Sequence, residues 1–188
     1  MDLERSRIVI TGGPGTGKTV LISALEAHGH YCFHEIIRDM TLEAKKEWGL
    51  ETQGTNPIAI VDDSKSFNTQ LLQGRLKQFK KALTLKEDMV FYDRGMPDVL
   101  AYMDYFEQAY ENDFTQICEQ HKYDCVFILP PWKEIYVQDN ERLERYDQAV
   151  EIYNHLKRTY TTLGYKITEV PFASIADRMH FIVNHLQK

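Results

Sequence analysis

The sequence GGPGTGKT, residues 12–19, decides which fold this chain can adopt. It fits the pattern G-x-x-x-x-G-K-[ST], in which Gly12 and Gly17 are the fixed glycines and Lys18 and Thr19 complete the motif. A glycine-rich turn lets consecutive backbone N–H groups point inward at phosphate oxygens, and the positive end of a helix that begins near Gly17 would face the same anion. The stretch therefore predicts a phosphate-binding loop.

The motif gives Lys18 and Thr19 separate roles. Lys18 is expected to reach the β- and γ-phosphates of a nucleoside triphosphate, and the Thr19 hydroxyl is expected to hold Mg²⁺. A glycine loop can match this pattern by chance, but the required context is present, because RIVIT (7–11) is typical of a strand and KTVLISALEAHG (18–29) of a helix. The residues predicted to contact the nucleotide are Gly12, Gly13, Pro14, Gly15, Thr16, Gly17, Lys18, Thr19 and Val20.

The rest of the chain alternates between strand and helix patterns. The predicted strands are 7–11, 31–35, 89–93, 124–129 and 165–170. The predicted helices are 18–29 (with Gly29 as its C-cap), 36–49, a long one after the candidate N-caps Asp62 and Asp63, one or two over 96–121, one that ends at Gly164, and 173–187. Short, nearly continuously apolar strands separated by helices predict an α/β fold, a three-layer α/β/α sandwich with a five-stranded parallel sheet.

Composition limits the classes of protein that need to be considered. The 188 residues, 43% of them hydrophobic, predict a single domain over residues 1–188. The net charge of -6 argues against a nucleic-acid partner. No apolar run approaches the ~18 residues that span a bilayer, and the start MDLERSR is too charged for a secretory signal. We expect a cytoplasmic protein, either a monomer or a homodimer, for which peripheral lipid binding stays open.

Two acidic residues follow predicted strands, Glu35 after the second and Asp93 at the end of the third. Ligands of parallel α/β sheets bind beyond the carboxyl ends of the strands, so both acids can face the predicted magnesium. A motor-type ATPase would more typically end such a strand in an acidic pair, whereas Asp93 is followed by Arg94 and Gly95. The planar, always charged fork of Arg94 suits a second anion or a polar acceptor. A surface pair between Asp93 and Arg94 is the alternative.

Three stretches carry a resemblance to a known family. They are ITGGPGTGKT (10–19), YDRG (92–95) and ERLERYDQAVEIYNHLKRTYTTLGY (141–165), with PPW (130–132) before the last. Together they resemble the small ATPases labelled AAA that are related to the nicotinamide riboside kinase domain, within the P-loop nucleoside and nucleotide kinase group. The resemblance covers nearly the whole chain and implies a kinase-like P-loop NTPase fold with a lid at about residues 130–146.

The lid carries two arginines that match lid residues of these kinases, Arg142 and Arg145. The resemblance implies that both close over the phosphates and stabilise charge in the loose transition state. Their spacing of three also permits an alternative without a catalytic role, in which both arginines form ion pairs with Glu141 and Glu144 on the helix surface.

The resemblance also implies roles at the reacting centre. Asp93 would be the metal-associated or base carboxylate, Glu35 would be its rival as general base and an acceptor contact, and Arg94 would face the acceptor. Adenine would rest against VPFAS (170–174), with Pro171 and Ala173 as its contacts and Ser174 as the cap of the last helix. Candidates for the acceptor wall, each of which could equally be a core residue, are Phe67, Gln70, Met96 and Tyr102.

These features predict an ATP-dependent kinase with ATPase activity and with ATP and Mg²⁺ as cofactors. Its acceptor would be a small nucleoside-, nucleotide- or pyridine-riboside-like molecule. No N-K-x-D or T-K-x-D guanine signature is present, which favours ATP over GTP. The alternative is a nucleotide-dependent regulatory or ligand-binding module that binds ATP or GTP and has no acceptor.

Overall fold

The sheet consists of parallel strands in the order β2-β3-β1-β4-β5. The computed structural model describes residues 6–37, 64–136 and 145–187. Ile10 of β1 is paired with Asp93 of β3, and Gly12 of β1 with Leu129 of β4. The carboxyl ends of these three strands therefore meet at one edge of the sheet. The strands are β1 (Ser6–Gly12), β2 (Tyr31–Phe33), β3 (Met89–Asp93), β4 (Cys125–Leu129) and β5 (Ile167–Glu169).

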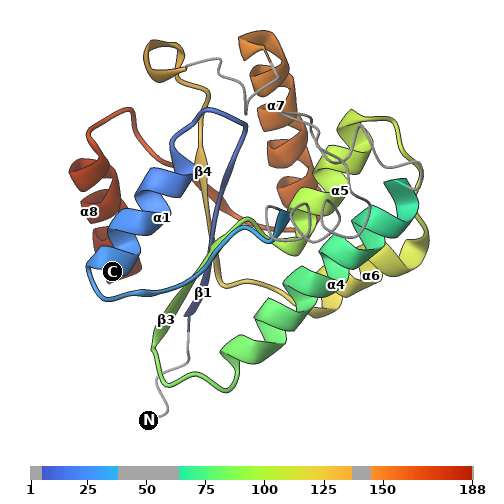
Figure 1. Cartoon of the computed structure of the whole chain (residues 1–188), viewed down its shortest axis with the longest axis horizontal. Helices are drawn as coiled ribbons and strands as arrows, with labels where there is room; N and C mark the ends of the chain where they lie inside the picture. Colours follow the sequence, from blue (N-terminus) through green and yellow to red (C-terminus); the bar gives the residue numbers. More distant parts are fainter. Residues whose placement is uncertain (1–5, 38–63, 137–144, 188) are drawn as a thin grey trace, which may run out of the picture.

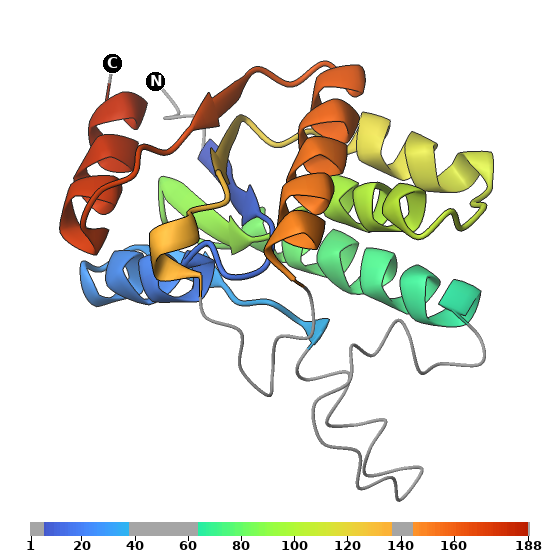
Figure 2. The same cartoon turned by 90° about the horizontal axis from the view of Figure 1, so that it is seen from above.

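Helices cover both faces of the sheet, which confirms the predicted three-layer architecture (Figures 1 and 2). One layer consists of α1 (Lys18–Ala27) and α8 (Ile175–Leu186). The other consists of α4 (Ser64–Ala82), α5 (Met96–Tyr105), α6 (Asn112–Gln120) and α7 (Tyr146–Thr162). A short 3-10 helix, η1 (Lys133–Ile135), follows β4.

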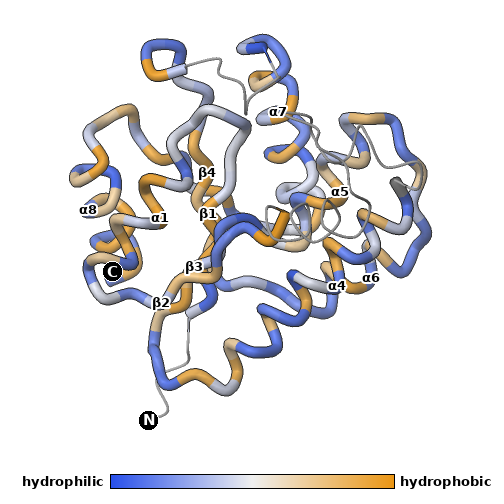
Figure 3. The backbone as a smooth tube through the Cα atoms, viewed as in Figure 1, coloured by the Kyte–Doolittle hydropathy of each residue, from blue (hydrophilic) through white to orange (hydrophobic). Residues whose placement is uncertain are grey.

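Two hydrophobic clusters lie on opposite sides of β1, because successive side chains of a strand point to opposite faces. Ile8 and Ile10 are fully buried against α1 and α8, whereas Val9 is fully buried against the layer of α4, α5 and α7. Figure 3 shows hydrophobic residues concentrated in β3 and β4 and recurring at intervals along the helices. A strand that is apolar on both faces fits only a central position in a sheet with two covering layers.

The predicted elements agree with the structure best in the centre of the sheet. β3 has the predicted bounds, whereas β2 ends at Phe33 and β5 spans only Ile167–Glu169. Both shorter strands lie at the edges, where a strand can form hydrogen bonds with only one neighbour. The predicted helix 36–49 and the candidate caps Asp62 and Asp63 fall largely or wholly outside the described residues.

The helix ends follow local sequence signals. The predicted 96–121 region forms two helices, α5 and α6. Gly29 and Gly164 both have the left-handed backbone that ends a helix, with φ of 89° and 83°. Ser174 caps α8 as predicted, since its Oγ accepts a hydrogen bond from Asp177 N at 3.2 Å. In the described ranges, none of the helices combines the length and hydropathy needed to cross a bilayer.

Candidate active site

The loop between β1 and α1 lies so close to neighbouring backbone that its first glycines cannot carry a side chain. A Cβ atom at Gly12, where φ is 149°, would lie 2.6 Å from the Leu129 carbonyl oxygen. One at Gly13 would lie 2.8 Å from the Ala149 carbonyl oxygen. β4 and α7 thus support the loop from behind. Both glycines are required by space, and Gly12 also by its backbone conformation.

The first turn of α1 is available to an anion. Gly17, the N-cap residue, has a left-handed backbone and provides no side-chain cap, and the first turn contains no acidic residue. The first N–H groups of a helix have no partner within it, and the helix dipole places positive charge there. The loop and this helix end can therefore cradle phosphate oxygens.

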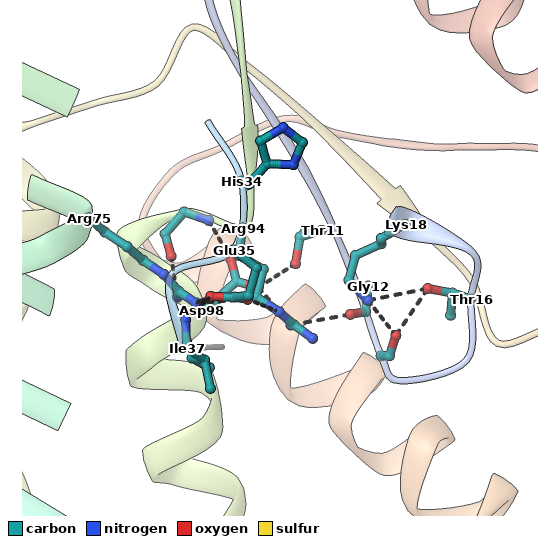
Figure 4. A network of polar contacts seen from close by, with 12 residues as sticks. Thr11, Gly12, Thr16, Lys18, His34, Glu35, Ile37, Arg75, Arg94 and Asp98 are labelled. Carbon is teal, nitrogen blue, oxygen red and sulfur yellow. Dashed lines mark hydrogen bonds and ion pairs between the residues drawn. The ribbon is translucent and has the colours of Figure 1, made fainter. Parts of the chain in front are cut away.

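The Lys18 side chain folds back onto the loop that precedes it. Its ammonium donates hydrogen bonds to the Gly13 carbonyl oxygen at 2.7 Å and to Thr16 Oγ1 at 3.5 Å (Figure 4). Burial, assisted by the charge of Arg94, lowers the pKa of Lys18 to about 7, although Asp93 opposes the shift. Since no carboxylate of the described residues forms an ion pair with this amine, an anion bound in the cradle would supply a close counter-charge.

Asp93 ends β3 beside this loop, and only 6% of its surface is exposed. Within the described residues, its carboxylate has no hydrogen-bond or ion-pair partner. Burial raises the pKa of Asp93, while the charge of Lys18 acts in the opposite direction. An unpaired carboxylate and the exposed Thr19 hydroxyl at the start of α1 offer the hard oxygen atoms that Mg²⁺ prefers, so the residues present fit this ion.

Arg94 joins the phosphate loop to a second polar cluster. Its Nε donates to Glu35 Oε2 at 2.6 Å, and its Nη1 lies 3.3 Å from Asp98 Oδ1 and 3.4 Å from the Gly12 carbonyl oxygen (Figure 4). A surface pair between Asp93 and Arg94 is therefore wrong, because both side chains are largely buried and the arginine pairs with other acids.

Arg94 has an unusual backbone, with a φ of 75° that residues other than glycine rarely adopt. Its N–H donates to the Ile10 carbonyl oxygen at 3.1 Å, which continues the pairing of β3 with β1. The turn directs the side chain along the carboxyl edge of the sheet, toward Glu35 and Gly12. Backbone strain of this kind costs about 1–3 kcal/mol and persists only where surrounding contacts enforce it.

Asp98, on α5, is fully buried and was not predicted. Its Oδ1 accepts from Thr11 Oγ1 at 2.6 Å and from Arg94, and its Oδ2 accepts from the Gly95 N–H at 2.9 Å and from the Tyr160 hydroxyl at 2.6 Å. The available signal was the sequence GMPD (95–98), since a glycine N-cap followed by Pro and an acid at the third helical position is typical of a helix start.

Arg75, on α4, was also missed. Its Nη2 donates to both carboxylate oxygens of Glu35, at 3.0 and 3.3 Å, and its Nη1 donates to the Gly95 carbonyl oxygen at 2.9 Å. Its position indicates burial, because it lies four residues from Leu71 and from Phe79 on the apolar face of the helix. The Glu35 carboxylate is thus paired with two arginines, whereas the Asp93 carboxylate has no such partner among the described residues.

The other predicted residues are distributed around this centre. Arg145 is the exposed N-cap of α7 and pairs with Asp147 at 3.0 Å. Arg142 lies outside the described residues. Val20 is 57% exposed on α1. Pro171 and Ala173 flank Phe172 in the loop after β5, and the Phe172 ring lies 5.3 Å from the Trp132 ring.

The four acceptor-wall candidates differ in their surroundings. Phe67 and Met96 belong to the hydrophobic core, and Gln70 is exposed. The Tyr102 ring lies under the Arg94 guanidinium, 5.1 Å from it.

The strand order, the glycine loop and Lys18 at the start of α1 define a P-loop protein of the nucleoside and nucleotide kinase type of fold. The chain belongs to a family described as an AAA domain, whose model matches residues 7–178. This confirms the AAA-labelled family that the sequence resembles. No curated protein matches the chain significantly.

Three solved structures illustrate the similarity of fold. A NadR protein in complex with NR has a TM-score of 0.69 and 14% identity, covering 97% of this chain and 50% of that one. Deoxyadenosine kinase from M. mycoides with products dCMP and dCDP has a TM-score of 0.66 and 15% identity, covering 96% and 98%. Thymidylate kinase from Ehrlichia chaffeensis has a TM-score of 0.64 and 15% identity, covering 98% and 100%. At these identities the likeness extends to the fold alone.

Proposed function

We propose that this protein is a magnesium-dependent kinase that transfers the γ-phosphate of ATP to a small acceptor of the nucleoside, nucleotide or pyridine-riboside type. Support comes from the family, from a fold shared with deoxyadenosine kinase, thymidylate kinase and NadR, and from the arrangement of charged residues beyond the sheet.

One observation carries the proposal. The open carboxylate of Asp93 and the cluster of Glu35, Arg94 and Asp98 all act electrostatically on Lys18, so both lie near the cradle. A nucleotide switch needs the cradle and a metal ligand, but it has no need of a second buried polar cluster beside the γ-phosphate position. A phosphotransferase needs such a cluster, because it must hold and orient an acceptor there.

The residues can be assigned roles in an in-line transfer. The loop N–H groups and Lys18 bind the β- and γ-phosphates, and Thr19 and Asp93 would hold Mg²⁺, which supplies charge neutralisation. Asp93 accepts the proton of the acceptor hydroxyl, with Glu35 as the rival base, and Arg94 orients the acceptor. Arg142 and Arg145 stabilise phosphate charge from the lid, and the adenine lies against Pro171 and Ala173.

The test is phosphate transfer from γ-labelled ATP to a panel of nucleosides, nucleoside monophosphates and pyridine ribosides. We expect at least one labelled product, absent from reactions with the Lys18→Met variant. Slow release of phosphate to water at a rate that no acceptor changes would contradict the kinase assignment. That result, with intact ATP binding, would favour the nucleotide-dependent regulatory module instead.

Nucleotide binding is expected to take up a proton above neutral pH. With a pKa of about 7, the Lys18 amine of the free protein is mostly neutral at about pH 8, whereas phosphate oxygens around it favour the ammonium. Binding at that pH must therefore protonate it, and affinity for ATP should fall by up to about tenfold per pH unit as pH rises above 7.

Calorimetry in two buffers of different ionisation enthalpy measures this proton uptake directly. The Lys18→Arg variant is the matched control, since its guanidinium stays charged throughout this range. Equal binding enthalpies in both buffers at about pH 8, with an affinity that does not change with pH, would show that Lys18 is already protonated in the free protein.

A further inference from the structure

Arg178 reaches the phosphate loop from the far end of the chain. It is the fourth residue of α8, which packs beside α1 (Figures 1 and 2). Only 5% of its surface is exposed, and its Nη1 donates to the Thr16 carbonyl oxygen at 3.1 Å. Its guanidinium also lies over the Trp132 ring, at 5.6 Å from the centroid. The side chain is therefore held between the loop and the segment after β4.

The charge of Arg178 has no counter-ion in the part of the chain that the structure describes. Arg7, Arg75, Arg94 and Arg145 each form an ion pair with a carboxylate there, whereas Arg178 contacts only a carbonyl oxygen and a ring. Its Nε is buried without a partner, and burial lowers the pKa of the guanidinium. A buried cation without an anion costs stability, so folding alone gives no reason for an arginine here.

The contact with Thr16 fixes the direction of one N–H group in the cradle. The Thr16–Gly17 peptide is trans, so its C=O and N–H point in opposite directions. Because Arg178 holds the C=O, the Gly17 N–H is directed away from α8, at the N-cap of α1. Gly17 has a φ of 84°, and a Cβ atom there would lie only 3.2 Å from Arg178 Nη1, so a glycine makes room for this approach.

We propose that Arg178 is a positioning residue for the polyphosphate of the nucleotide, acting through the Thr16–Gly17 peptide. It orients the Gly17 N–H toward the anion and supplies a positive charge behind the loop, which no carboxylate of the described residues neutralises and which a bound polyphosphate would neutralise. This inference rests on the proposed nucleotide-binding function. Arg178 thus acts in recognition of the phosphate chain. It contributes neither to recognition of the base nor to stability of the free protein.

The test compares Arg178→Met with Arg158→Met, a control that removes an exposed arginine bonded to His155 on α7. Inorganic tripolyphosphate and adenosine are titrated separately as competitors of a fluorescent ATP analogue. For Arg178→Met we expect tripolyphosphate affinity to fall by about 10- to 50-fold, as for loss of a charge-assisted contact, with adenosine affinity within about twofold of wild type. The Arg178→Lys variant, which keeps the charge, should recover most of the loss.

The melting temperature of the ligand-free protein provides a second readout. Removing an uncompensated buried charge should leave it unchanged or raise it, whereas removing a structural residue would lower it. The inference is overturned if Arg178→Met binds tripolyphosphate as wild type does, if its affinities for tripolyphosphate and adenosine fall equally, or if it fails to fold. A wild-type protein that binds neither ATP nor tripolyphosphate would instead refute the proposed function.

Discussion

Replacing Asp93 with asparagine should lower phosphate transfer by about a thousandfold, within the range for loss of a general base, while nucleotide affinity stays within about threefold of wild type. The carboxylate is buried at the end of β3 without a partner in the described residues, and it lies beside Lys18. Asparagine keeps its shape but removes the charge that would hold a metal ion and accept a proton. The phosphate cradle itself is built from backbone and Lys18, so binding should survive.

Single-turnover kinetics and equilibrium binding of ATP measure the two quantities separately. Asp88→Asn is the matched control, because Asp88 is exposed just before β3. Turnover at the wild-type rate in Asp93→Asn would remove this residue from the mechanism. Glu35→Gln in the same assay distinguishes the rival base, since a complete loss there together with an active Asp93→Asn variant would assign proton transfer to Glu35.

Replacing Asp98 with alanine should destabilise the fold by about 3–5 kcal/mol, the range for removal of one partner of a buried ion pair. Its carboxylate accepts hydrogen bonds from Thr11, Gly95 and Tyr160 and pairs with Arg94. Alanine would leave these donors without an acceptor in an interior that water does not reach. Urea unfolding gives the free energy directly.

The matched control is Asp147→Ala, which breaks an ion pair of similar length between side chains that are 70% and 63% exposed. Exposed pairs contribute about 0–1 kcal/mol, so this variant should be nearly as stable as wild type. If Asp98→Ala costs no more than Asp147→Ala, the buried network does not stabilise the fold.

The Asp98 network should also make stability depend on acid pH. Burial alone would raise the pKa of Asp98, but Arg94, Arg75 and hydrogen bonds from Thr11 and Tyr160 together hold it below its usual range. The unfolded chain therefore takes up this proton at a higher pH than the folded protein does. The stabilisation is complete above the unfolded pKa of about 4 and is lost as pH falls through the folded value.

The sequence was sufficient to predict the phosphate loop and the layers of the fold, because both depend on local patterns. Gly12, Gly17 and Lys18 are constrained by conformation and by their neighbours along the chain, and the apolar strands show that the sheet is covered on both faces. The same reasoning located Glu35 and Asp93 at strand ends.

The pairing of charges could not be predicted, because it depends on which distant elements meet. Arg94 remains the proposed acceptor contact, but the sequence did not indicate that its Nε pairs with Glu35 and its Nη1 with Asp98. Arg75 and Arg178 lie in the apolar stripes of their helices, where an arginine is a sign of a buried partner. The sequence identifies such positions, but only the folded chain shows that one reaches Glu35 and the other Thr16.

The two outer strands in the described part of the sheet, β2 and β5, are only three residues long each. A short edge offers few free N–H and C=O groups to another chain, which protects against aggregation by strand addition. Glu169 on β5 adds a charge to that edge, and its carboxylate is already occupied by Lys157 and Tyr153. The described part of the sheet accordingly offers too little edge for a continuous intermolecular sheet to grow on.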